Sequence, residues 1–356
     1  SYLKPDGQVV ACIPNVQHFT VIQQLLTQNF QYHGAGLLDK THVNLMTLPN
    51  MFKMFLDAGY LPQLKQVIHN GAIDEGFMNS LHPVLGYLGI APERAKLTLE
   101  AFQYVLSARI QQANLNRLAV WQNKVKPQAC TVVVAANNAL QYNNNIAASP
   151  ELARNDRQHQ LLPITGARHM AEAWQDAVAH VDHNWIVLVH RDVYLPAGWI
   201  EQVQYAWHEA EKKLKQQVAV LGVAGVSNIK DADFCQLGAC VDRVMIFAPS
   251  AALPELCQSL DELVLVFRKD RFLPELSADL GFHLYGSDAV MRAQRAGLNA
   301  AVVDLPCVHN SSRVDNHMQD EDLKQKALAF HRLWQHRLPV YTLVAQFQPE
   351  QIVFNH

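Results

Sequence analysis

The alternation of apolar and polar positions divides the chain into two parts with different predicted elements. In the first part, the apolar run GQVVACIPN predicts a strand that ends at Pro14, and TLPNMFKMFLDAGY has the spacing of a helix. Thr47 can cap this helix, and Gly59 can end it in the left-handed conformation. The run AFQYVLSARI predicts the closing strand of this part.

The second part begins after a polar connector that ends near Pro127, and here predicted strands and helices alternate. The apolar runs TVVVAANN, NWIVLVHRD and LVLVFRKD are typical of buried strands. The segments ITGARHMAEAWQDAVAHV, AGWIEQVQYAWHEAEKKLKQQ and GSDAVMRAQRAGL have helical spacing. Such alternation predicts an α/β layer fold, and we place the domain boundary near residue 126.

The composition is that of a well-buried globular protein, and it excludes several functional classes. The chain has 356 residues, of which 49% are hydrophobic, and this length predicts two domains. A net charge of -3 without a long basic run argues against nucleic acid as a partner. The longest apolar run, VAVLGVAGV, is too short to cross a bilayer, which takes about 20 residues.

The cysteine pattern and the first residues indicate a cellular compartment. The six cysteines form no C-x-x-C pair, so we expect reduced thiols, and the sequence predicts no signal peptide. We therefore expect a cytoplasmic protein, with peripheral attachment at the inner face of a membrane as the alternative.

Polar residues end three predicted strands, at the position where ligands bind in an open parallel sheet: TVVVAANN, WIVLVHRD and AVVDLPCVHN. His190 and Asp192 follow one strand, and His309 follows another. On an extended backbone His190 and Asp192 would point to the same side, and with His309 they would form a three-ligand metal site. Mixed imidazole and carboxylate ligation suits Mn²⁺, Zn²⁺ or Fe²⁺ better than Mg²⁺. A hydrogen-bonded turn is the commoner reason for an H-x-D at a strand end.

The order of these motifs resembles that of the nucleotide-sugar glycosyltransferases of the GT-A fold, the family-two-like group. The matching stretches lie between about residues 130 and 312: TVVVAANN, ITGARHMAEAW, DHNWIVLVHRDVYLPAGW, DELVLVFRKD, GFHLYGSDAVMRAQRAGLNAAVVDLP and VHNSS. The resemblance implies an α/β, Rossmann-like GT-A domain. It also implies metal-dependent, inverting transfer of a sugar from a nucleotide-sugar donor to a hydroxyl of a glycan, lipid-linked or protein acceptor.

The resemblance also implies roles for the residues at the strand ends. In that family an Asp-x-Asp holds a metal on the diphosphate, and the corresponding residues here are His190 and Asp192. His309 matches a later histidine of the metal site, for which the expected ion is Mn²⁺ or Mg²⁺. Two further segments would bind the nucleotide. The first would lie against the nucleoside, and the second would approach the phosphates: Ala135, Asn137 and Asn138, then Gly166, Ala167 and Arg168.

The catalytic base follows less directly from the resemblance. An inverting transferase needs a carboxylate near the acceptor hydroxyl. Many members carry a Glu-Asp pair whose positions here are Tyr285 and Gly286, and Asp288 is the nearest acid after them. We expect Asp288 to be the base, unless it only caps its helix. Asp261 or Glu262 is the alternative.

The first part resembles the second half of a class I S-adenosylmethionine-dependent methyltransferase. The stretches that carry this resemblance are LKPDGQVVACIPN and GLLDKTHVNLMTLPNMFKMFLDAGY. Such a remnant would supply the last three strands of that sheet, which are neighbours, and it lacks the glycine-rich cofactor loop. We therefore expect a partial methyltransferase-like domain at 1–125 and a GT-A domain with a C-terminal helical extension at 126–356. An inactive GT-A binding module, or a fragment of a bifunctional methyltransferase-glycosyltransferase, is the alternative.

Overall fold

The computed structural model describes residues 3–4, 7–110, 127–153, 158–227, 236–238, 240–242, 245–247, 253–311 and 321–355. The chain divides into two compact units, the first formed mainly by residues 1–115 and the second by most of the remaining chain. The boundary that we predicted near residue 126 lies within 111–126, outside the described residues.

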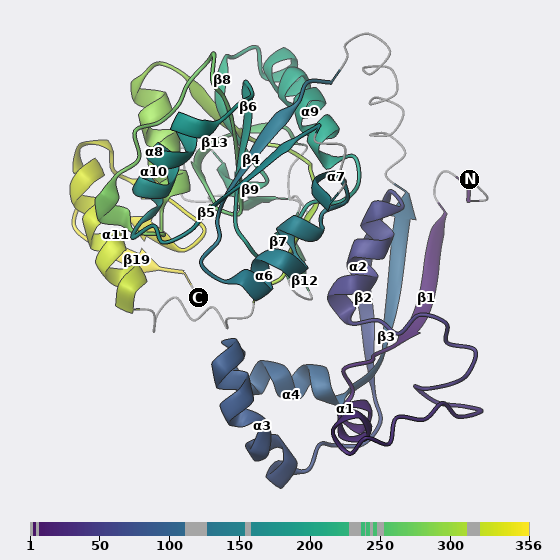
Figure 1. Ribbon diagram of the computed structural model, residues 1–356. Coiled ribbons are helices and arrows are strands. Elements are labelled where there is room, and N and C mark those ends of the chain that lie inside the picture. The colour runs from purple at the N-terminus through teal and green to yellow at the C-terminus, as the bar shows by residue number, and fades with distance from the viewer. Residues whose placement is uncertain are drawn as a thin grey trace. The chain divides into compact units, whose positions relative to one another are not determined.

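The first unit is built on a three-stranded antiparallel sheet with the order β1-β3-β2 (Figure 1). Its strands are β1 (Gln8–Pro14), β2 (Tyr60–His69) and β3 (Ala101–Ile110). Its helices are α1 (Phe19–Leu26), α2 (Leu48–Asp57), α3 (Glu75–Leu88) and α4 (Pro92–Glu100). The predicted closing strand is β3. This small sheet does not show the methyltransferase resemblance, which stays a proposal.

The bounds of α1 and α2 follow from local chemistry. Helix α1 begins at Phe19, because the His18 side chain accepts the Thr20 N–H and caps the helix. Thr47 occupies the cap position of α2 but makes no side-chain hydrogen bond there. Gly59 follows α2 with a φ of 79°, a left-handed conformation that favours glycine.

The second unit contains a nine-stranded sheet with the order β10-β9-β13-β15-β8-β14-β6-β4-β5. Its strands are β4 (Cys130–Ala135), β5 (Gln160–Ile164), β6 (Trp185–Val189), β8 (Val218–Gly222), β9 (Ala224–Ser227), β10 (Gln236–Gly238), β13 (Glu255–Leu260), β14 (Val264–Arg268) and β15 (Asn299–Val302). A second sheet has the order β12-β11-β16-β7. It contains β7 (Val193–Tyr194), β11 (Cys240–Asp242), β12 (Met245–Phe247) and β16 (Cys307–His309).

The large sheet of this α/β unit is mixed, with both parallel and antiparallel pairs. β4 pairs in parallel with β5 and β6, whereas β14 pairs antiparallel with β6 and β8. Val264 at the start of β14 lies opposite Val189 at the end of β6. The residues that precede β14 are therefore brought to the same edge of the sheet as the residues that follow β6.

Helices cover both faces of this sheet, as alternation along the strands requires. Val187 and Val189 of β6 face a core with α9 (Trp199–Leu214), and Ile186 and Leu188 face a core with α8 (Met170–His180) and α10 (Tyr285–Arg295). Figure 1 shows α8 and α10 on one side of the strands and α9 on the other. Two short helices follow β4: α6 (Ala139–Asn144) and α7 (Pro150–Ala153).

The C-terminal extension is only partly helical. Helix α11 (Glu321–Trp334) is followed by an antiparallel sheet of β17 (Val340–Tyr341), β18 (Ala345–Phe347) and β19 (Ile352–Phe354). Phe330 and Trp334 of α11 share a buried cluster with Met291 of α10. Among the described residues, no helix has the length and apolar character needed to cross a membrane.

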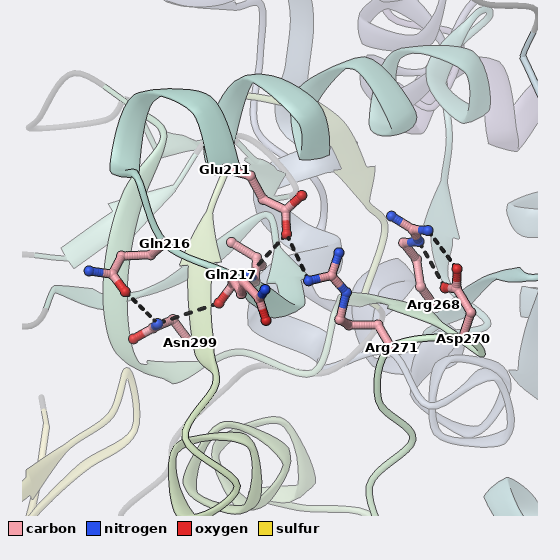
Figure 2. Close-up of polar contacts among 8 residues, drawn as sticks. Glu211, Gln216, Gln217, Arg268, Asp270, Arg271 and Asn299 are labelled. Carbon is pink, nitrogen blue, oxygen red and sulfur yellow. Dashed lines mark hydrogen bonds and ion pairs between the residues drawn. The ribbon is translucent and has the colours of Figure 1, made fainter.

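Polar contacts stabilise the edge of the large sheet where β8 and β15 begin (Figure 2). The carboxylate of Glu211, at the end of α9, accepts the N–H of Val218 over 3.1 Å and lies 3.5 Å from the guanidinium of Arg271. The Asn299 amide donates to the Gln216 side chain over 3.3 Å. These contacts connect α9 and the residues after β14 to this edge of the sheet.

Candidate metal centre

The structure brings His190, Asp192 and His309 together at the edge where β6 ends. One potential ligand atom from each lies within 4.8 Å of the other two. Nε2 of His309 is 3.5 Å from Oδ1 of Asp192, and the two imidazole rings are 6.2 Å apart. Two ligand atoms that each bind one ion at about 2.0–2.3 Å can lie 3.5 Å apart, as these two atoms do. The three side chains therefore suit a single divalent ion.

A turn and a strand pair explain this convergence. The chain leaves β6 at Val189 and turns at residues 191–192, with the N–H of Val193 donating to the carbonyl of His190 over 3.2 Å. His309 then pairs with Val193, the residue that follows Asp192. The extended backbone that we predicted for His190 and Asp192 is wrong. The tight turn, together with β16, brings the ligands into reach.

Burial and neighbouring charges set the protonation of the cluster. Burial raises the pKa of Asp192, but hydrogen bonding and charge from His309, with a smaller effect of His190, hold it below the usual value for a carboxyl. Burial lowers the pKa of the His190 imidazole, against the opposing charge of Asp192. Metal ligation needs an ionised carboxylate and neutral imidazoles. The site therefore favours the forms of Asp192 and His190 that bind metal.

The end of β4 lies beside this cluster. Val134 pairs with Val189, so Ala135 extends to the level of His190. Asn137 is exposed, whereas Asn138 caps α6 by accepting the N–H of Gln141 over 3.1 Å. The first predicted nucleotide segment, residues 135–138, thus lies at the same edge as the candidate metal ligands. Of its two asparagine side chains, that of Asn138 is already used to cap α6.

The second predicted nucleotide segment follows β5. Gly166 has a φ of 75°, so the turn there needs a left-handed conformation. The guanidinium of Arg168 is exposed and pairs with Glu172, with Nε 3.2 Å from Oε2 and a second contact of 3.3 Å. Exposed pairs of this kind contribute little to stability, because water screens the two charges. Breaking the Arg168–Glu172 pair so that Arg168 can bind a phosphate therefore costs little free energy.

Asp288 lies deep between α10 and α11, not at the surface of the site. It has no exposed surface, and its Oδ1 accepts the indole N–H of Trp334 over 3.0 Å. Its Oδ2 accepts from Nε of Arg292 over 2.9 Å and from the N–H of Ser277 over 3.0 Å. The residue at the cap position of α10 is Leu284, so Asp288 is not the cap either. The base role of Asp288 stays a prediction, but these contacts favour a structural role.

Asp261 and Glu262, the alternative acids, lie close to His190 of the candidate metal centre. They come directly before β14, and the N–H of His190 donates to the carbonyl of Leu263 over 3.0 Å. Tyr285 lies on the same side, with its ring 6.3 Å from the His190 ring and its hydroxyl donating to the carbonyl of Glu262 over 3.3 Å. We did not predict Tyr285 as a residue of the site from the sequence. Its place at the family's acid position could have indicated it.

Three solved structures are similar to parts of the chain at low identity. The mannosyltransferase PcManGT from Pyrobaculum calidifontis, in complex with GDP-Man and Mn²⁺, is 13% identical with a TM-score of 0.39, covering 64% of this chain and 74% of its own. A197 from STIV is 8% identical with a TM-score of 0.30, covering 64% and 94%. TarS 1-349 from S. aureus is 11% identical with a TM-score of 0.34, covering 59% and 75%.

No protein-family model matches the chain, and no curated protein matches its sequence. With TM-scores no higher than 0.39, the structural likenesses assign no activity to this chain.

Proposed function

We propose that the second unit is a metal-dependent glycosyltransferase, which moves a sugar from a nucleotide-sugar donor to a hydroxyl acceptor with inversion. The observation that carries the proposal is the convergence of His190, Asp192 and His309 at the edge of the sheet, within 4.8 Å of one another. The resemblance of the sequence to GT-A enzymes supports a position for the diphosphate of the donor at this edge. Parallel strands also end here, which is where ligands bind in open α/β sheets.

The side chains of the site have distinct tasks in this reaction. His190, Asp192 and His309 would hold Mn²⁺ or Mg²⁺, which when bound supplies positive charge for the diphosphate leaving group. Residues 135–138 would lie against the nucleoside, and residues 166–168 would approach the phosphates. Arg168 would exchange Glu172 for a phosphate oxygen, since its present pair is exposed.

Inversion follows from a single displacement. The acceptor oxygen attacks the anomeric carbon from the face opposite the diphosphate, and the bond from that carbon to the diphosphate breaks. A carboxylate takes the hydroxyl proton as the new bond forms. A metal held by His190, Asp192 and His309 would offset the charge that develops on the leaving group, while the proton acceptor must lie on the acceptor side.

Calorimetric titration with UDP-, GDP- and dTDP-sugars, with and without Mn²⁺, tests the proposal. We expect one nucleotide class to bind only with Mn²⁺ and to release its nucleoside diphosphate on incubation. The variant His309→Ala should lose this binding, and His180→Ala, at an exposed histidine near the end of α8, should keep it. Metal-dependent binding without any release would favour the inactive binding module. Binding that ignores Mn²⁺ would contradict the proposal.

For the first unit we propose a methyltransferase-like remnant without methyl transfer of its own. Its three strands are neighbours in one sheet, as such a remnant requires. Micromolar binding of S-adenosylmethionine, measured by calorimetry, would contradict this proposal.

A further inference from the structure

We propose that Asp261 is the carboxylate that takes the proton of the acceptor hydroxyl, in place of the acid pair that the resemblance locates at positions 285 and 286. This inference rests on the proposed glycosyl transfer. It assigns a task to the segment 261–262, which the structure places beside His190.

The start of α10 leaves no room for an acid side chain at position 286. A Cβ atom at Gly286 would lie 2.6 Å from the carbonyl oxygen of Leu260 and 3.1 Å from that of Asp261. The first turn of α10 therefore packs directly on the backbone of residues 260–261. Position 285 carries a tyrosine, so neither position of the family's acid pair can supply a carboxylate.

Glu262 interacts with the start of α10 through its carboxylate. Its carboxylate accepts the backbone N–H groups of Gly286 and Leu284, so it caps α10 from a neighbouring loop. The residue at the helix cap, Leu284, is left-handed with a φ of 56° and offers no side-chain cap. The N–H groups of a helix start need such an acceptor. Glu262 is therefore held in a structural position.

The raised pKa of Glu262 also leaves little of its ionised form at neutral pH. Burial, and after it the charge of Asp261, raises the pKa of Glu262 to about 8. A carboxyl group with that pKa carries its proton through most of the neutral range. Of the two adjacent acids, Asp261 is therefore the one whose carboxylate can accept the proton.

Asp261 has one oxygen anchored and one oxygen available. Its Oδ1 accepts the N–H of Leu263 over 2.9 Å, and its own N–H donates to the carbonyl of Ala224 over 2.9 Å. Among the residues that the structure describes, Oδ2 makes no hydrogen bond. The charge of Asp261 acts on both His190 and Tyr285. The carboxylate is thus close to His190 of the candidate metal centre and half-buried.

The proposed step is balanced without any further reactant. The acceptor oxygen forms a bond to the anomeric carbon, and the bond from that carbon to the diphosphate oxygen breaks. The hydroxyl proton moves to Asp261 Oδ2, and the nucleoside diphosphate leaves with its negative charge. The base must come within about 3 Å of the acceptor oxygen, or one water away.

The test compares Asp261→Asn with the wild-type protein and with Asp279→Asn, a control at an exposed aspartate that makes no ion pair among the described residues. Release of nucleoside diphosphate from the donor that binds with Mn²⁺ should fall by about 10²-fold or more in Asp261→Asn. The Mn²⁺-dependent affinity for the nucleotide should stay within about threefold, since a base contributes to the transition state and not to donor binding. Addition of formate should restore release in Asp261→Ala, which a purely structural role does not predict.

Each outcome decides between the two proposals. Near-normal release by Asp261→Asn overturns the assignment of the base and leaves the glycosyl transfer intact. A 10²-fold loss confined to Asp288→Asn returns the role to Asp288. Equal loss of nucleotide affinity and release in Asp261→Asn, without rescue by formate, makes Asp261 a structural residue. A wild-type protein that binds nucleotide but releases no diphosphate from any donor overturns both.

Discussion

The indole N–H of Trp334 donates a hydrogen bond to Oδ1 of Asp288 over 3.0 Å. This contact joins α11 to α10 through a carboxylate without any exposed surface. The opposite oxygen of Asp288 accepts from Arg292 over 2.9 Å, so the charge of the buried carboxylate is partly balanced. The C-terminal helix is therefore bound to the core of the second unit by a polar contact as well as by apolar packing.

The variant Asp288→Asn should destabilise the protein. An amide cannot accept with both of its polar atoms, so at least one of the three donors around residue 288 loses its partner. Breaking a buried pair of this kind costs about 2–4 kcal/mol. We expect a lower urea midpoint with an unchanged m-value. A midpoint equal to that of the wild type would contradict this account of Asp288.

The variant Asp192→Ala should abolish metal-dependent nucleotide binding while the fold stays intact. Asp192 is the only carboxylate of the three-ligand cluster and lies in a turn, so it contributes charge more than packing. Calorimetry with Mn²⁺ and the nucleotide measures the loss, and circular dichroism checks the fold. Asp182→Ala, at an exposed aspartate before β6, is the matched control. Unchanged affinity in Asp192→Ala would exclude the metal centre.

The variant His190→Asp should change the preference for the ion. With a second carboxylate in place of an imidazole, the ligand set has more oxygen atoms, which Mg²⁺ prefers. We expect the affinity for Mg²⁺ relative to Mn²⁺ to rise by about tenfold or more. Titration of each ion against the wild type and the variant checks this. An unchanged ratio would mean that residue 190 does not ligate the ion.

The variant Glu262→Gln should flatten the pH dependence of stability. The folded protein holds the pKa of Glu262 at about 8, above the ordinary value of 4.5, so folding favours the protonated form. Its contribution to stability is fully present below pH 4.5 and is lost as the pH rises through about 8. The slope that it adds is at most about 1.4 kcal/mol per pH unit.

Urea unfolding at several pH values compares the two proteins. The wild type should lose more free energy of unfolding than Glu262→Gln between about pH 5.5 and about pH 8.5. Parallel curves for the two proteins would show that Glu262 does not titrate in this window.

The variant Gly286→Ala should destabilise the start of α10. The added Cβ would meet the carbonyl oxygen of Leu260 at 2.6 Å, and backbone shifts that relieve such overpacking cost about 1–3 kcal/mol. Gly86→Ala in α3 is the matched control, because nothing lies within 4 Å of its Cβ position. Removing a glycine from a helix interior there should stabilise by about 0.5–1 kcal/mol. Equal thermal midpoints for the two variants would contradict this packing.

Much of the fold was predictable where one local pattern determines one element. The apolar runs of β4, β6 and β14 predicted these strands because their residues are buried on both faces. The strand β2 was not predicted, because its sequence YLPQLKQVIH contains a proline and a lysine and is only partly buried. The continuous apolar run VAVLGVAGV does not show that it divides into β8 and β9, which pair with different neighbours.

The metal cluster was predictable in its membership but not in its geometry. Histidine and aspartate at strand ends identified His190, Asp192 and His309. The turn at residues 191–192 and the pairing of His309 with Val193 depend on contacts between distant segments, which no local pattern shows. The burial of Asp288 also depends on a distant segment, since Trp334 of α11 donates a hydrogen bond to its carboxylate. The local sequence therefore identified the candidate ligands, and pairing between distant segments of the chain brings them close together.

The three candidate ligands, His190, Asp192 and His309, come from the end of β6 with the turn after it and from β16, segments that adjoin only in the folded chain. An unfolded chain offers the ion isolated side chains of low affinity. By mass action, an ion that binds the native state alone stabilises it by about 2.7 kcal/mol at a hundred times its Kd. The melting temperature of the second unit should therefore rise with the concentration of the preferred ion. A chelator should lower it, and the melting temperature becomes a measure of metal occupancy that needs neither donor nor acceptor.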